Sequence, residues 1–68
     1  MDIDREARYV YIEFRHHLGE GKPPTRLARR LAENGIYSPS DAVRVVRAAS
    51  DLYYRDYFAA NPVLRPIG

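Results

Sequence analysis

Six of the eleven basic residues in this 68-residue sequence lie between positions 22 and 47, a segment with only two acidic residues. The six are Lys22, Arg26, Arg29, Arg30, Arg44 and Arg47. Residues 1–21 carry three basic and five acidic residues, so the net charge of +2 conceals a local excess of positive charge. Concentrated positive charge attracts phosphate groups, which indicates anion binding. An ordinary solvated helix face, with Arg29 paired to Glu33, would use the same residues.

The residues that other chemistries require are sparse. The sequence has no cysteine, which excludes disulfides, thiolate nucleophiles and cysteine-based metal sites. Ser38 and Ser40 have no histidine or lysine at a spacing that predicts contact, so neither is expected to act as a nucleophile. His16 and His17 would point about 100 degrees apart on a helix, whereas histidines that share a metal on a helix are four residues apart. We therefore expect no enzyme, no metal and no cofactor.

A short amphipathic helix, predicted over residues 25–34, would position half of these basic residues. Its apolar residues fall on one face at helical spacing, and they are Leu27, Ala28, Leu31 and Ala32. Arg26, Arg29 and Arg30 fall outside that face. Asn34 and Gly35 end the helix, because glycine adopts the left-handed backbone conformation at little cost.

A longer helix is predicted over residues 39–60, and it has the clearest start in the sequence. Ser38 can cap it, Pro39 suits the first helical position, and Asp41 complements the helix dipole. The sequence Asn-Pro at 61–62 ends it. Its buried face is predicted to comprise Ala42, Val43, Val45, Val46, Ala49, Leu52, Tyr53 and Tyr57.

A third helix is predicted at the N-terminus over residues 3–18, with Asp2 or Asp4 as its cap and Gly19 as its end. Its apolar stripe comprises Ile3, Ala7, Val10, Tyr11, Phe14 and Leu18. A turn leads from it to the second helix. Residues 61–68 are expected to form an extended, proline-containing tail that either folds back to cover the end of the bundle or stays extended as a ligand for another protein. The sequence therefore predicts one all-α, three-helix domain over residues 1–68.

A set of short motifs surrounds the turn between the predicted 25–34 and 39–60 helices. They are Leu27-Ala28, Leu31-Ala32, Gly35-Ile36, Ser38-Pro39-Ser40 and Val43-Val46. In this pattern, residues 23–49 resemble the helix-turn-helix superfamily of DNA-binding proteins. The second helix of that motif enters the major groove. The resemblance implies a small regulatory protein that binds double-stranded DNA with its 39–60 helix as the recognition helix.

Docking the start of the 39–60 helix in a major groove assigns each candidate residue a role. Phosphate contacts at the helix start are expected from Tyr37, Ser38 and Ser40. Arg44 and Arg47 would reach base edges, where a guanidinium can bridge O6 and N7 of guanine. Contacts to the DNA backbone are expected from Lys22, Arg26, Arg29 and Arg30. Asp41 weighs against this hypothesis, because a carboxylate beside the groove repels phosphate unless it serves only its own helix.

Aromatic residues suggest a protein interface as well. Six tyrosines and two phenylalanines are many for this length, and some fall outside the predicted core. The residues that would form an exposed interface are Tyr9, Ile12, Tyr54, Arg55 and Phe58. They favour a homodimer that presents two recognition helices. The alternative is a non-enzymatic adaptor or inhibitor that binds a larger protein, such as transcription or replication machinery.

The sequence also bears on location. No apolar run approaches the roughly 20 residues of a membrane span. The N-terminal sequence MDIDRE is acidic, whereas a secretory signal begins with basic residues that an apolar run follows. The expected location is the cytoplasm, without membrane contact.

Overall fold

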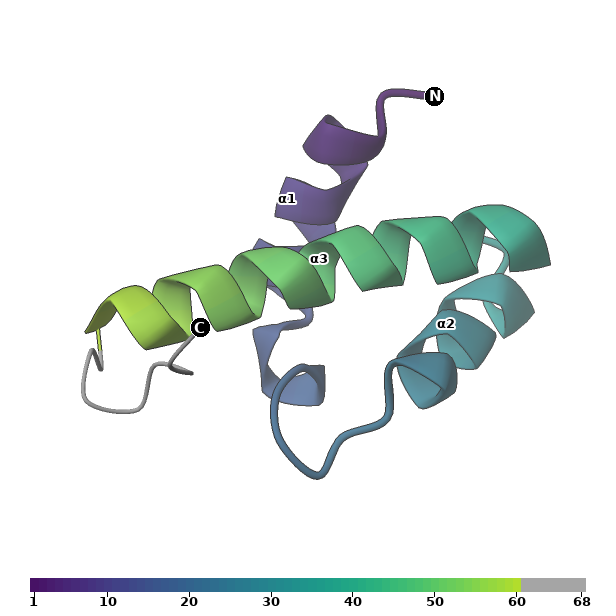
Figure 1. The fold of residues 1–68 in the computed structure, drawn as a ribbon. Helices are drawn as coiled ribbons and strands as arrows, with labels where there is room; N and C mark the ends of the chain where they lie inside the picture. Colours follow the sequence, from purple (N-terminus) through teal and green to yellow (C-terminus); the bar gives the residue numbers. More distant parts are fainter. Residues whose placement is uncertain (61–68) are drawn as a thin grey trace.

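The computed structural model describes residues 1–60, which form three α-helices and one short 3₁₀ helix (Figure 1). These are α1 (Ile3–Glu13), η1 (Arg15–His17), α2 (Pro24–Glu33) and α3 (Pro39–Ala60). The described residues contain no strand. Both α1 and α2 pack against α3, with α1 crossing behind its middle and α2 beside its N-terminal half (Figure 1). The predicted all-α, three-helix fold is confirmed, and the predicted tail lies outside the described residues.

Two of the helices begin at the predicted cap residues. The Asp2 Oδ1 atom accepts a hydrogen bond from the Arg5 amide at 3.3 Å, and Ser38 Oγ accepts one from the Asp41 amide at 3.3 Å. Each bond satisfies an amide that has no partner within its own helix. The remaining helix, α2, begins at Pro24, one residue before the predicted start. Proline suits this position because it has no amide hydrogen that would need a partner.

The first helix is shorter than predicted, because α1 ends at Glu13 and not near Leu18. Phe14 leaves the helical region at φ −121° and ψ 26°, and the 3₁₀ turn of η1 follows. This tighter turn redirects the chain toward α2 while Leu18 still enters the core, at 3% exposed. The segment Arg15–His17 contains no helix-breaking residue, so the sequence carried no signal for this end.

One apolar cluster joins the three helices. Its buried members are Ala7, Val10, Leu18, Leu27, Ala28, Leu31, Tyr37, Ala42, Val45, Val46 and Ala49. Two predictions about α3 are wrong, since Val43 and Tyr57 were assigned to its buried face but are 45% and 39% exposed. Val43 lies at the outer edge of the contact with α2. Tyr57 lies about two turns beyond Ala49, the last buried residue of α3 among those described.

The turn after η1 passes close to α3 at Gly19, which has φ +109°. A Cβ atom here would lie 2.8 Å from the Tyr53 hydroxyl oxygen. The left-handed backbone favours glycine here, and any side chain would also press against the end of the Tyr53 ring. Gly21, in the same turn, has φ +77° but faces open space.

Replacing Gly19 by alanine is expected to destabilise the protein by about 1 kcal/mol or more beyond the loss caused by Gly21→Ala. Both variants strain a left-handed backbone, but only Gly19→Ala forces a methyl group against Tyr53. Urea unfolding followed by circular dichroism measures the difference. Equal losses in the two variants would show that the close approach to Tyr53 has no energetic consequence.

Tyr37 connects the turn before α3 to α1. Its side chain is 9% exposed, and its hydroxyl donates a hydrogen bond to Glu6 Oε1 at 2.8 Å. Burial, together with this bond to a carboxylate, raises the pKa of the Tyr37 phenol well above its usual range. The bond therefore fixes the turn that precedes α3 against a helix far away in the sequence.

Removing the hydroxyl in Tyr37→Phe is expected to lower the free energy of unfolding by about 1–2 kcal/mol, because the bond to Glu6 is lost. The folded state favours the neutral phenol, so this stabilisation is complete below a pH of about 10 and declines as the pH rises above it. Urea unfolding at about pH 8 and about pH 11 should show the advantage of the wild type over the variant shrinking at the higher pH.

The matched control is Tyr11→Phe. The Tyr11 hydroxyl donates a similar hydrogen bond to Asp56 Oδ2 at 2.9 Å, but at the exposed surface. Water replaces an exposed bond at little cost, so this variant should lose less stability than Tyr37→Phe. The interpretation fails if Tyr37→Phe is no less stable than Tyr11→Phe near neutral pH.

Candidate functional site

The N-terminal half of α3 presents the two predicted base-reading arginines to solvent. Arg44 and Arg47 are both exposed, and Ser40 precedes them by four and seven residues on the same side of the helix. Within residues 1–60, no carboxylate pairs with Arg47, whereas Arg44 Nη1 lies 3.8 Å from Asp41 Oδ1. The Arg44 side chain is 65% exposed, so solvent screens this ion pair and its contribution is small. Both guanidinium groups are therefore accessible to an external anion.

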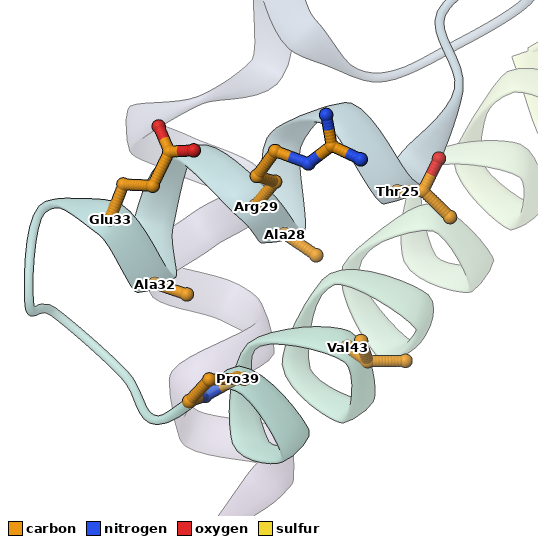
Figure 2. Close-up of a pocket in the computed structure, with 7 residues that line it drawn as sticks. All are labelled: Thr25, Ala28, Arg29, Ala32, Glu33, Pro39 and Val43. Carbon is orange, nitrogen blue, oxygen red and sulfur yellow. The ribbon is translucent and has the colours of Figure 1, made fainter.

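The arginines of α2 are also exposed and unpaired within the described residues. Arg26, Arg29 and Arg30 form no ion pair there, and the predicted pair of Arg29 with Glu33 is not formed. Figure 2 shows the Arg29 and Glu33 side chains extending in different directions from the helix. The predicted Arg29–Glu33 pair is therefore wrong, whereas the exposure of all three arginines agrees with a solvated helix face.

The structure does not bring all the predicted DNA-contacting residues to one surface. Arg29 lies on the flank of α2 that borders α3, where it lines a groove with Val43. Arg26 and Arg30 lie on the other flank, where they line a separate cavity with Lys22. This division follows from helix geometry, since position 29 is rotated by about 100 degrees from position 30. The basic residues of α2 therefore belong to two surfaces.

A groove of about 440 Å³ lies between α2 and the start of α3 (Figure 2). Its lining residues are Thr25, Ala28, Arg29, Ala32, Glu33, Pro39 and Val43. A neighbouring cavity of about 250 Å³ shares Thr25, Ala28 and Val43 with it and extends to Arg47. The groove is open because alanines at positions 28 and 32 are too short to cover Val43. The two alanines were the sequence signal that could have predicted the groove. It was missed because Val43 was assigned to the core.

The two predicted phosphate-contacting residues before α3 have different environments. Tyr37 is a core residue whose hydroxyl is bonded to Glu6. It is therefore not available for the phosphate contact that was predicted. Ser38 is exposed, and its oxygen accepts the capping bond from the Asp41 amide. The Ser38 hydroxyl hydrogen can still be donated to an external acceptor.

The predicted protein interface is divided as well. Its residues are exposed or half-buried, and they are Tyr9, Ile12, Tyr54, Arg55 and Phe58. The Tyr9 ring contacts the Phe14 ring with centroids 6.2 Å apart, and Tyr54 stacks on Phe58 at 6.2 Å. Ile12 is 74% exposed. Among the described residues, no ring contact links Tyr9 to Tyr54 or Phe58, so α1 and α3 present separate patches.

Comparisons with protein-family models, curated proteins and solved structures give no match to this chain. No helix within residues 1–60 is long and apolar enough to cross a membrane. The same part of the chain contains no group of three or more histidine, cysteine, aspartate or glutamate side chains that could hold a metal ion. The described residues present exposed guanidinium groups and an apolar groove, and both features suit binding.

Proposed function

We propose that the protein binds double-stranded DNA and that the N-terminal half of α3 docks in the major groove. The observation that carries this proposal is the exposure of Arg44 and Arg47 on one side of α3. A guanidinium in the major groove can donate two hydrogen bonds to guanine. The order of α2, turn and α3 is also that of helix-turn-helix proteins, and membership of that superfamily is part of the proposal.

Residues beside the two arginines would contact the DNA backbone. Ser40 lies one turn before Arg44, and Arg29 lines the groove whose continuation reaches Arg47. Asp41 opposes binding, because its carboxylate lies beside Arg44 and would repel DNA phosphates. Arg44 would lose little binding energy on leaving Asp41 for a base edge, because solvent screens their exposed ion pair.

Binding of this kind would act by occupying a DNA site. We therefore propose transcription regulation as its role, in the cytoplasm. We also propose that the protein is a homodimer, because a second copy would supply a second α3 for an adjacent half-site. The patches around Ile12 on α1 and around Tyr54 and Phe58 on α3 are the surfaces proposed for this contact.

The double variant Arg44→Gln/Arg47→Gln is expected to weaken binding to a mixed-sequence duplex by about 10–100-fold, because each arginine supplies a base or phosphate contact. Fluorescence anisotropy at two salt concentrations measures the affinity and its salt dependence. The matched control is Arg5→Gln/Arg8→Gln, which removes the same charge from exposed sites on α1. Loss of affinity of equal size in the control, or no binding at low salt, would rule out docking by α3.

The groove between α2 and α3 supports a second candidate function, binding of an amphipathic segment of another protein. The groove exposes Val43 beside two alanines, and a helix laid in such a groove buries its apolar face. Arg29 and Arg47 lie on α2 and α3 respectively. They favour a segment with acidic residues on both sides of an apolar stripe.

A phage-displayed library of helical peptides tests this second function. Selection against the protein is expected to enrich apolar residues at helical spacing, with flanking aspartate or glutamate. Binding of the selected peptides should be lost in Val43→Glu and kept in Ile12→Glu, which adds the same charge at an exposed apolar position on α1. Peptides that bind Val43→Glu as well as they bind the wild type would exclude the groove as their site.

A further inference from the structure

A second cavity lies on the flank of α2 that faces η1, away from the groove. Its volume is about 160 Å³, and its lining residues are His16, His17, Lys22, Arg26, Leu27 and Arg30. Five of these six side chains are basic, and none is acidic. Glu20, which lies only two residues before Lys22, does not line the cavity. The polar side chains that face this space are therefore all basic.

Local contacts hold the basic groups of η1 and the following turn at the cavity. Lys22 Nζ donates a hydrogen bond to the His16 carbonyl oxygen. The Lys22 amide donates another to the Gly19 carbonyl oxygen at 3.2 Å. The His17 ring lies beside the Phe14 ring, with centroids 6.3 Å apart. These contacts position the Lys22 and His17 side chains on one wall.

The opposite wall comes from α2. Arg26 and Arg30 are four residues apart, so they project from the same face of the helix one turn apart. Neither forms an ion pair within residues 1–60. Leu27 is 2% exposed and closes the cavity toward the core. Like charges at a spacing of four residues repel, so an anion between the two arginines would remove an unfavourable interaction.

We propose that this cavity binds a phosphate group. Lys22, Arg26 and Arg30 supply the positive charge, and the two histidines supply further donors. Guanidinium groups form short, charge-assisted hydrogen bonds with phosphate oxygens. The cavity is compact, which suits a tetrahedral oxyanion. This site goes beyond the proposed function of α3, because it recognises phosphate without reading a base.

Nuclear magnetic resonance titration of the wild-type protein with inorganic phosphate, against chloride at equal ionic strength, is the direct test. Saturable shifts are expected at the amides of Lys22, Arg26 and Arg30 and at the imidazoles of His16 and His17. Arg29 and Arg44 should not shift. Absence of saturable shifts, or equal shifts at Arg29 and Arg44, would overturn the proposal.

Paired variants separate the cavity from general attraction between opposite charges. Arg26→Gln/Arg30→Gln is expected to weaken phosphate binding by about tenfold or more. The control Arg29→Gln/Arg44→Gln removes the same charge from outside the cavity and should change affinity by less than about threefold. Equal weakening in both would overturn the proposal. The exposed positions make loss of folding unexpected, and the wild-type titration does not depend on either variant.

Duplex DNA distinguishes the source of the phosphate. If Arg26→Gln/Arg30→Gln weakens binding of inorganic phosphate, and weakens binding of duplex more than Arg5→Gln/Arg8→Gln does, the ligand is a backbone phosphate of DNA. If it weakens only inorganic phosphate, the ligand is free phosphate or a phosphomonoester. Phosphate binding without any duplex binding would overturn the function proposed for α3 and leave this site standing. Duplex binding without saturable shifts on titration with inorganic phosphate would overturn the phosphate site and leave the function proposed for α3 standing.

Discussion

The packing of two helices against one short stripe of small residues on α3 is the interaction on which the structure depends. Ala42, Val45, Val46 and Ala49 are each at most 1% exposed, and α1 and α2 both pack against α3. Alanine and valine let helices approach closely, which increases the dispersion contacts that each buried atom makes. A small protein has little apolar surface to bury, so both helix contacts depend on this one stripe of α3.

Polar and steric contacts outside this stripe hold the connecting segments. The bond from Tyr37 to Glu6 attaches the turn before α3 to α1. The close approach of Gly19 to Tyr53 sets how near the turn after η1 can lie to α3. Both contacts join residues far apart in the sequence. They matter because a thin core leaves the direction of each connecting segment poorly determined by hydrophobic burial alone.

The same packing decides which basic residues can act together. Because Leu27 and Leu31 of α2 are buried in the core, Arg29 is turned toward α3 and Arg26 and Arg30 toward η1. An external ligand therefore meets two separate basic surfaces. One combines guanidinium groups with an apolar groove, and the other is a small cavity lined by donors. Their separation is the reason that DNA docking at α3 and phosphate binding beside η1 can be tested independently.

Much of the fold follows from local signals in the sequence. The caps at Asp2 and Ser38 and the periodic apolar residues of α2 define the helices, because capping and helical periodicity act over a few neighbouring residues. The sequence also determined that positive charge would concentrate around α2 and the start of α3.

Only the tertiary structure decided which residues on the edge of a helix face are covered. Val43 and Tyr57 have core-like spacing but stay exposed, and Tyr37 is taken out of the predicted site by its bond to Glu6. The end of α1 at Glu13 was likewise set by the return of the chain and not by a breaking residue. These differences have one physical reason. Periodicity specifies the centre of an apolar face, whereas its width and length depend on how far the neighbouring helices extend and at what distance they pack.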